Sequence, residues 1–288
     1  MNKQILILTN SFRSHLNFRS ELSHYLNQNY DLTIIAKNDL IKDKDLNTYC
    51  SRFIDLNLRG NMYFSEVINF FKTFLSIYNF KGNLLIAYTL KPILYTLLCN
   101  IFFRKKNIIF FTGLGSILIN KKRFIFKIIK TLLFFLIKHN RSKIVVLNSY
   151  DYRYFKLYTN NQIHKIESEG INTKLYPSCK ITKKINTIGY IGRFISDKGF
   201  NLMVDLLEDP SFQEQNFIFI GGEDKNNPSN TRYDLEHLRN KYKNLIIISW
   251  VDDIIKHAHD IDLLLLPSQR EGASRIVLEF MLMNKLVL

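Results

Sequence analysis

The stretch that decides the fold lies near the end of the chain: Pro267-Ser268-Gln269-Arg270-Glu271-Gly272-Ala273-Ser274-Arg275-Ile276-Val277-Leu278-Glu279-Phe280-Met281. It follows an apolar run, residues 262–266, which predicts a buried strand. Pro267 and Ser268 end that strand, and Ser274 is placed to cap a helix that carries Glu279. The predicted order is strand, loop, helix, with Glu271 in the loop and the second glutamate in the helix.

Two carboxylates at this spacing suit an extended ligand, and the helix start between them suits an anionic part of that ligand. A fully helical step from Glu271 to Glu279 rises about 12 Å, roughly the distance between the two sugars of a nucleotide diphosphate sugar. The unpaired backbone amides at a helix start favour an anionic group. The alternative is an amphipathic helix with a solvated glutamate at each end, because two glutamates at this spacing are common by chance.

Glu271 and Glu279, placed after a Pro-Ser loop, resemble the E-x7-E signature of family 4 retaining glycosyltransferases. The segments Arg270-Glu271-Gly272 and Leu278-Glu279-Phe280-Met281 are similar to the REG…LEAM form of bacterial surface-polysaccharide enzymes. The resemblance implies the GT-B fold, in which two Rossmann-like domains with doubly wound parallel sheets face a cleft.

Short apolar runs alternate with helical patterns along the whole chain, which independently predicts doubly wound parallel sheets. We expect a first domain over 1–171, a linker over 172–185, and a second, incomplete domain over 186–288. The predicted strands are residues 4–9, 32–36, 53–58, 84–87, 107–112, 144–148, 187–191, 217–220, 245–249 and 263–266. The predicted helices are residues 17–28, 64–80, one that starts at Pro92, and 123–138.

The loops after the first-domain strands carry further resemblance, although each alone could be an ordinary turn. Ser11-Phe12-Arg13 and Asn17-Phe18-Arg19 resemble the first loop and helix of the family. Tyr88-Thr89-Leu90-Lys91-Pro92 is similar to its YTxKP loop, and Phe111-Thr112-Gly113-Leu114-Gly115 to its TGLG loop. The resemblance implies that four residues line the acceptor side of the cleft: Thr89, Lys91, Gly113 and Gly115. Many members place a histidine where this chain has Thr112-Gly113, so no catalytic histidine is assigned.

A second motif opens the second domain, Gly192-Arg193-Phe194-Ile195-Ser196-Asp197-Lys198-Gly199. It is similar to the family's GRxxxxKG loop, which implies that Arg193 and Lys198 bind the donor diphosphate. Arginine can contact phosphate oxygens bidentately and lysine adds a compact charge. The resemblance gives catalytic roles to Glu271, Arg193 and Lys198. It gives donor contacts to Gly192, Arg193, Lys198, Glu271, Gly272, Ala273, Ser274 and Glu279. The alternative for this motif is a basic turn on a βα unit.

The charge of the chain is unevenly placed. Residues 1–180 contain 27 Lys and Arg against 10 Asp and Glu, whereas residues 181–288 contain 13 against 15. A basic first half and a near-neutral second half imply different partners. Residues 123–138 mix aromatic and basic side chains without an uncharged run long enough to span a bilayer. This segment is either a helix that lies at an anionic membrane surface or a buried helix with a basic outer face. Binding of nucleic acid by the same basic residues is a third possibility, but no nucleic-acid recognition motif accompanies them.

Cysteine and histidine are sparse and badly spaced for metal or disulfide chemistry. Cys50, Cys99 and Cys179 lie far apart, which fits a reducing cytoplasm. His257 and His259 are two apart and point to different helix faces, so we predict no metal site. Residues 5–8 form an apolar run too short for a signal peptide.

The end of the chain departs from the family pattern. Asn284 and Leu286 stand where the family has glycine and proline, and the resemblance leads us to expect a truncated second domain.

The function that the resemblance implies is a retaining hexosyl or N-acetylhexosaminyl transferase of capsule or O-antigen-type polysaccharide assembly. A nucleotide-sugar, preferably a UDP-sugar, would be the donor, without cofactor or metal. A lipid-linked saccharide, of undecaprenyl-diphosphate type, would be the acceptor at the cytoplasmic face of the plasma membrane. The alternatives are an inactive membrane-associated pseudo-glycosyltransferase and, more weakly, a GT-B phosphorylase or epimerase.

Overall fold

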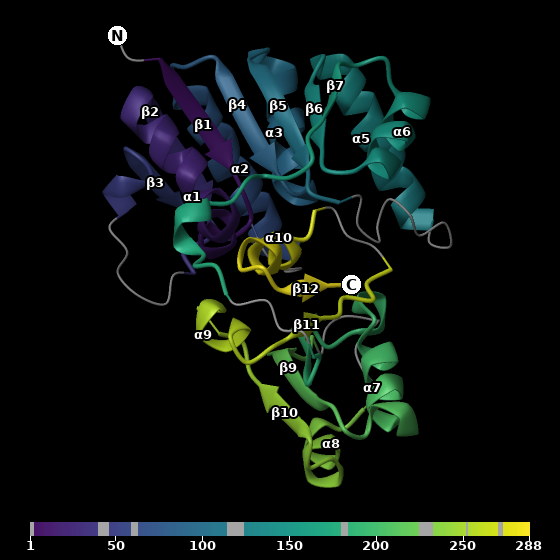
Figure 1. Cartoon of the computed structure of the whole chain (residues 1–288). Helices are drawn as coiled ribbons and strands as arrows, with labels where there is room; N and C mark the ends of the chain where they lie inside the picture. The colour runs from purple at the N-terminus through teal and green to yellow at the C-terminus, as the bar shows by residue number, and fades with distance from the viewer. Residues whose placement is uncertain are drawn as a thin grey trace. The chain divides into compact units, whose positions relative to one another are not determined.

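Two parallel sheets, one in each half of the chain, organise the structure, which is a computed structural model (Figure 1). It describes residues 3–39, 46–58, 63–113, 124–179, 184–224, 233–251, 253–269 and 273–288. The chain divides into a first unit, Met1–Gly170, and a second unit, Ile171–Leu288.

The first sheet has seven strands in the order β3-β2-β1-β4-β5-β6-β7, all parallel. Side chains alternate along its strands, so each strand supplies both faces. Ile5 and Ile7 of β1 pack with Phe12 of α1, whereas Leu6 and Leu8 belong to the core cluster under α2, α3 and α5. In Figure 1, α1 lies in front of this sheet and α2 and α3 lie behind it. The helices therefore cover both faces, as a doubly wound sheet requires.

The elements of the first unit are bounded as follows. The strands are β1 (Gln4–Leu8), β2 (Asp31–Ala36), β3 (Arg52–Asp55), β4 (Leu84–Tyr88), β5 (Lys106–Phe111), β6 (Lys143–Val146) and β7 (Ile163–Lys165). The helices are α1 (Phe12–Asn29), α2 (Tyr63–Asn79), α3 (Leu90–Phe103), α5 (Phe124–Asn140) and α6 (Ser149–Tyr158).

The second sheet has five parallel strands in the order β10-β9-β8-β11-β12. Phe217 and Phe219 of β9 enter the core with α7 and α8, and Ile218 and Ile220 enter the core with α9 and α10. The strands are β8 (Thr187–Arg193), β9 (Asn216–Gly222), β10 (Leu245–Ile248), β11 (Leu263–Leu264) and β12 (Leu286–Val287). The helices are α7 (Phe200–Glu208), α8 (Leu235–Lys241), α9 (Ile255–Ala258) and α10 (Arg275–Leu282).

Three local predictions were wrong. The first helix begins at Phe12 rather than residue 17, because the Ser11 hydroxyl accepts a hydrogen bond from the Ser14 amide and caps it. Strand β7, at one edge of the first sheet, was missed because it is only three residues long and mostly polar. The apolar run 262–266 contains a strand of two residues, and only Leu264 of that strand is fully buried.

Candidate functional site

The strand order reverses beside the first strand of each sheet, between β1 and β4 and between β8 and β11. Ligands of open parallel sheets bind outside the carboxyl ends of the strands at such switch points. In the second unit, β8 ends at Arg193 and the chain after β11 runs into Pro267. Both sequence motifs of this unit therefore emerge at its switch point.

The structure brings these two loops into direct contact. The backbone amide of Gln269 donates to the carbonyl of Asp197 at 3.1 Å. Gly199 has φ +74°, and a Cβ added there would lie 2.2 Å from the Pro267 carbonyl oxygen. The close approach explains why a glycine stands at the end of the GRxxxxKG loop. Arg270, Glu271 and Gly272 lie outside the described residues, so the loop glutamate stays a prediction.

Arg193 is held at the carboxyl edge by an acidic neighbour. It is paired in register with Gly222 of β9, and its Nη1 atom donates to Asp224 Oδ2 at 3.0 Å. Both side chains are partly exposed, so the ion pair can be opened by a competing anion at modest cost. Lys198 is the half-buried last residue of the short 3-10 helix Ser196–Lys198 on the same loop. Gly192 precedes Arg193 in β8, and its carbonyl oxygen would lie 1.8 Å from a Cβ on Gly221.

Trp250 also lies at the carboxyl edge of the second sheet, and the sequence analysis did not predict it as a site residue. It follows β10, and a Cβ added to Gly222 would lie 3.0 Å from its Nε1 atom. Its side chain is 56% exposed, which is high for an indole packed on a strand end. The usable signal was its position directly after a predicted strand, together with the Gly221-Gly222 pair that allows the ring to approach.

Glu279 lies in a buried polar cluster rather than in open solvent. Its Oε1 atom accepts hydrogen bonds from Arg275 Nε and from the Tyr176 hydroxyl, both at 2.7 Å. Arg275 Nη2 also donates to the Tyr176 hydroxyl at 3.2 Å, and burial raises the pKa of that tyrosine. The Glu279 carboxylate is therefore held by Arg275, four residues earlier in α10, and by Tyr176, in the segment before β8. Its role toward a donor ribose stays a prediction.

The start of α10 differs from the expected capping arrangement. Ser274 occupies the N-cap position, but its side chain makes no capping hydrogen bond. Its backbone is extended with ψ 111°, and Ala273 precedes it in irregular structure. The predicted position of the helix start was therefore right and the predicted side-chain cap was wrong.

The carboxyl edge of the first sheet contains a strained residue. Thr89, directly after β4, has φ 66° and ψ 154°, a backbone conformation that is costly for a β-branched side chain. Backbone strain of this kind is concentrated at functional sites, and the place of Thr89 in the acceptor cleft stays a prediction. Gly113 after β5 has φ +148° with nothing within 4 Å of an added Cβ. Gly115 lies outside the described residues.

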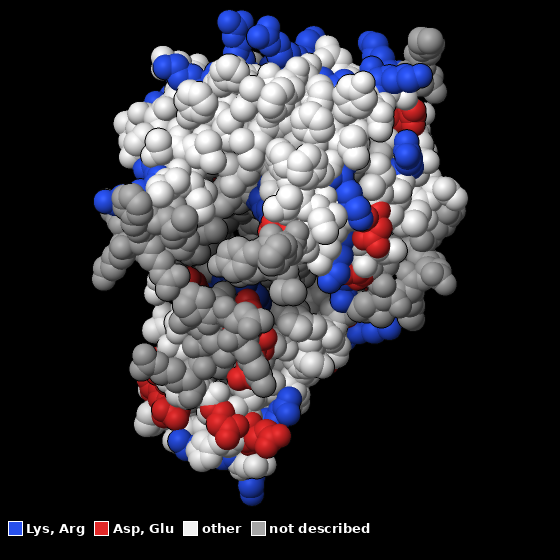
Figure 2. Space-filling view, turned by 180° about the vertical axis from the view of Figure 1, so that it is seen from behind, with Lys and Arg blue, Asp and Glu red and all other residues white. Residues whose placement is uncertain are grey.

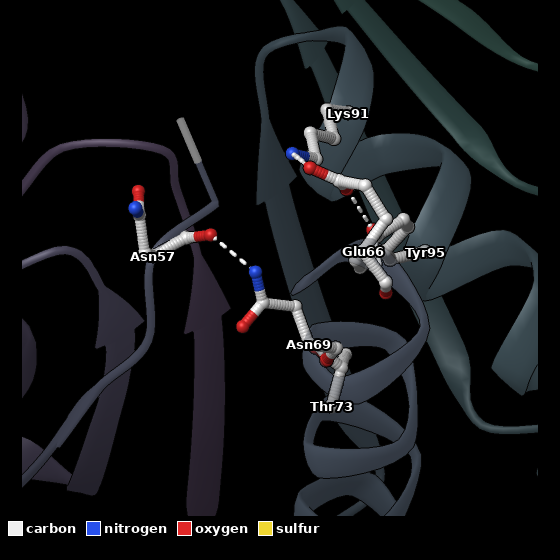
Figure 3. Close-up of polar contacts among 6 residues, drawn as sticks. All are labelled: Asn57, Glu66, Asn69, Thr73, Lys91 and Tyr95. Carbon is white, nitrogen blue, oxygen red and sulfur yellow. Dashed lines mark hydrogen bonds and ion pairs between the residues drawn. The ribbon is translucent and has the colours of Figure 1, made fainter. Parts of the chain in front are cut away.

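Lys91 is engaged in a polar cluster between α2 and α3 (Figure 3). Its Nζ atom lies 2.5 Å from Glu66 Oε1, and the Tyr95 hydroxyl donates to Glu66 Oε2. Burial, and next the hydrogen bond to the carboxylate, raise the pKa of Tyr95. The lysine charge predicted for acceptor binding is thus balanced by a carboxylate that the sequence analysis did not single out.

A second buried polar cluster sits where α1 passes the end of β4. Arg19 has non-helical φ/ψ inside α1, and its guanidinium lies 4.0 Å from the centre of the Tyr88 ring. Its Nη2 atom is 2.5 Å from Glu169 Oε1 in a nearly buried ion pair. His15 Nε2 lies 2.8 Å from the hydroxyl of Ser23. Arg19 lies in a stretch that the sequence analysis singled out, but its pairing with Glu169 was not predictable from the sequence.

The buried imidazole makes the first unit sensitive to acid. Burial, aided by the charge of Arg19, lowers the pKa of His15 to about 3 from 6.5. Between these values the unfolded chain binds a proton that the folded unit does not, so folding stability falls as pH falls from about 6.5 towards 3. The expected slope is at most about 1.4 kcal/mol per pH unit.

Denaturant unfolding of the wild type and of His15→Gln at several pH values measures this slope. The variant should lack the component from His15 while keeping a polar group that can reach Ser23. Equal pH dependence of the two proteins would contradict the assignment.

No group of three or more His, Cys, Asp or Glu side chains among the described residues is placed to hold a metal ion. No helix in the described ranges has both the length and the apolar character needed to cross a bilayer.

Comparison with known proteins adds a family match for the second unit. Residues 174–288 match the sequence model of the family described as glycosyl transferases group 1. No curated protein sequence matches the chain.

Solved structures match nearly the whole chain at low identity. Sucrose-phosphate synthase from Thermosynechococcus elongatus is 14% identical with a TM-score of 0.76, covering 99% of this chain and 80% of that one. HepE from Anabaena, in complex with UDP-glucose, is 13% identical with a TM-score of 0.71, covering 99% and 79%. The lipopolysaccharide outer core galactosyltransferase WaaB, in its apo form, is 14% identical with a TM-score of 0.64, covering 99% and 79%.

At these identities the structural matches establish the fold, and they confirm the predicted GT-B class with its two Rossmann-like parallel sheets. The family match concerns the unit that carries Arg193, Lys198 and Glu279. The chain therefore has a GT-B fold whose second unit matches the glycosyl transferases group 1, and this supports a glycosyltransferase.

Proposed function

We propose that the chain is a retaining, family 4-type glycosyltransferase that transfers a hexosyl or N-acetylhexosaminyl group from a UDP-sugar. The observation that carries the proposal is the contact between the loops after β8 and β11, made by Gln269 with Asp197 and by Pro267 with Gly199. It places the Arg193 loop beside the loop that leads to Glu271. The match of this unit to the glycosyl transferases group 1 supports the same reading.

Each residue of the donor site then has a chemical role. Arg193 and Lys198 hold the diphosphate and stabilise the negative charge that develops on the leaving nucleotide. Glu271 contacts the hydroxyls of the transferred sugar, assisted by Gly272 and the amides of Ala273 and Ser274. Glu279, whose carboxylate is oriented by Arg275 and Tyr176, contacts the ribose. The leaving phosphate takes the proton of the acceptor, so no separate base is required.

The acceptor is a lipid-linked saccharide, of undecaprenyl-diphosphate type, used in capsule or O-antigen-type polysaccharide assembly at the cytoplasmic face of the membrane. Thr89, Lys91, Gly113 and Gly115 line its path in the first unit. One structural relative supports this reading, since it is a galactosyltransferase of the lipopolysaccharide outer core. Another, solved with UDP-glucose, supports the UDP-sugar donor.

The first test is calorimetric titration of the full chain with UDP-, GDP- and ADP-sugars. We expect saturable binding of one nucleotide series, with UDP-sugars preferred. Transfer to a lipid-linked acceptor is then measured with the donor that binds. Donor binding without transfer to any lipid-linked acceptor would point to an inactive pseudo-glycosyltransferase, and no binding by the folded chain would overturn the donor assignment.

Trp250 gives the donor site a built-in reporter, because it is the only tryptophan of the sequence. Its exposed ring beside Gly222 offers a stacking surface for the nucleobase, near Arg193 on the adjoining strand. Titration with UDP should therefore change the tryptophan emission. Base stacking on an aromatic ring is worth about 1–3 kcal/mol, so Trp250→Ala should lower UDP affinity by about tenfold or more, while Trp250→Phe should largely keep it. Calorimetric binding without any change in emission would contradict this placement of the base.

A further inference from the structure

The outward side of α2 is apolar although it faces solvent. Five of its side chains are more than half exposed, and their spacing places them on one side of the helix. We call them the α2 stripe: Val67, Ile68, Phe71, Leu75 and Tyr78. Large contiguous areas of exposed apolar surface are rare on soluble monomers and mark sites of interaction with a protein, a ligand or a membrane.

The inward side of the same helix fixes this orientation. Asn69 and Thr73 are buried, and Asn69 Nδ2 donates to the carbonyl of Asn57 at 2.7 Å (Figure 3). Thr73 Oγ1 donates to the Asn69 carbonyl at 2.8 Å, and Ile77 is fully buried. Rotation of α2 to hide the stripe would break the Asn69–Asn57 hydrogen bond and would move Ile77 out of the core, and each change is costly.

The apolar surface continues over the neighbouring helices. α3 packs against both α2 and α5, and it contributes the exposed ring of Phe102. α5 buries Leu133 and Leu136 and exposes Ile128 and Phe135. In the rear view of Figure 2, the first unit has a broad area of uncharged residues with Lys and Arg at its margins. The described side chains of α5, from Lys127 to Lys138, are thus buried on one side of the helix and apolar and basic on the other.

The charges around this surface have one sign. No Asp or Glu occurs between Glu66 and Asp151, whereas 14 Lys and Arg do. Lys72 lies within the span of the stripe and is exposed, as are Lys127 and Lys138 on α5. A symmetric dimer through this surface would set like charges against each other. An anionic layer with an apolar interior complements both the apolar centre and the basic margin.

We infer that the α2 stripe, extended by α3 and α5, docks the chain on the surface of a bilayer that contains anionic lipid. The helices lie along the headgroup region with the aromatic and aliphatic side chains inserted and the lysines at the phosphates. The inference deepens the proposed function by naming the surface that meets the membrane of the lipid-linked acceptor.

Vesicle co-sedimentation tests the inference with two matched variants. Leu75 and Leu202 are the same residue type, are 55% and 56% exposed, and sit on helices of different units. The wild type should bind vesicles of mixed phosphatidylcholine and phosphatidylglycerol, and bind pure phosphatidylcholine vesicles much less. Leu75→Ser should lower the partition coefficient by about tenfold, from the apolar burial lost, and Phe71→Ser with Leu75→Ser by more. Leu202→Ser should stay within about twofold of the wild type. Lys72→Glu should reduce the preference for phosphatidylglycerol.

Three results would overturn the inference: no binding of the wild type to mixed vesicles, equal losses in Leu75→Ser and Leu202→Ser, or a wild-type dimer that Leu75→Ser converts to monomer. Circular dichroism and UDP affinity show whether the variants stay folded. Both should be unchanged in Leu75→Ser, because Leu75 is exposed and lies in the first unit, away from the proposed donor site in the second. Vesicle binding without sugar transfer would leave the docking surface standing and remove the proposed function. Sugar transfer to a lipid-linked acceptor in detergent, without vesicle binding, would remove the docking surface and leave the proposed function standing.

Discussion

Replacing Arg193 with alanine is expected to weaken UDP binding by about tenfold to a hundredfold. A charge-assisted hydrogen bond contributes about 1.5–3 kcal/mol, and each 1.4 kcal/mol is a factor of ten in affinity. Arg193 ends the central strand β8 at the switch point of the second sheet, where an anionic ligand would approach. Calorimetry with UDP measures the loss. Arg193→Lys should lose part of the affinity, because lysine cannot contact phosphate bidentately.

Asp224→Ala is the control that separates ligand binding from structure. It breaks the same ion pair from the other side. If Arg193 binds the diphosphate, removal of the competing carboxylate leaves UDP affinity unchanged or higher. If the ion pair serves only to hold the loop, the two alanine variants should lose affinity equally, and that result would remove Arg193 from the donor site.

Replacing Gly199 with alanine should destabilise the second unit by about 2–5 kcal/mol. The left-handed backbone at φ +74° costs an L-residue about 1–2 kcal/mol. The added Cβ would also collide with the Pro267 carbonyl oxygen at 2.2 Å, and backbone atoms cannot move aside as a flexible side chain can. Overpacking of this kind adds about 1–3 kcal/mol. Denaturant unfolding measures the change.

Gly170→Ala provides the comparison for Gly199→Ala. Gly170 also has a positive φ, +86°, but nothing lies within 4 Å of an added Cβ. This variant should cost only about 1–2 kcal/mol, from backbone strain alone. Similar losses in the two variants would mean that the loops after β8 and β11 part easily, and the proposed donor site would lose its main support.

Regular elements with strong local patterns were predictable from the sequence. The strands β1, β2, β4 and β5 were placed within one residue at each end, because short runs rich in Ile, Leu and Phe bounded by polar residues admit few other structures. The strand-order reversals, and hence the switch points, depend on pairing between distant strands and could not be read from any local pattern.

The parts of the candidate site that belong to one local motif were predictable from the sequence. The contacts between side chains that are distant in the sequence were not. Gly199 and the Pro267 loop were recognised as two motifs, but their contact depends on the pairing of β8 with β11. Asp224 and Tyr176 became partners of Arg193 and Glu279 only through the fold. The exposed apolar side of α2 could not be predicted for another reason. Its apolar sequence pattern predicts burial, and only the packing of the helix shows which side faces solvent.

The guanidinium of Arg19 has a consequence for how the first unit forms. It meets Tyr88 and Glu169, and the ion pair joins positions 150 residues apart. Closure of so long a loop is entropically costly, so the contact cannot assist the early steps of folding. It is completed only after the sheet from β1 to β7 is in place. Interactions that form after the transition state act on the unfolding rate. Arg19 therefore contributes to the lifetime of the native first unit rather than to the speed at which it is reached.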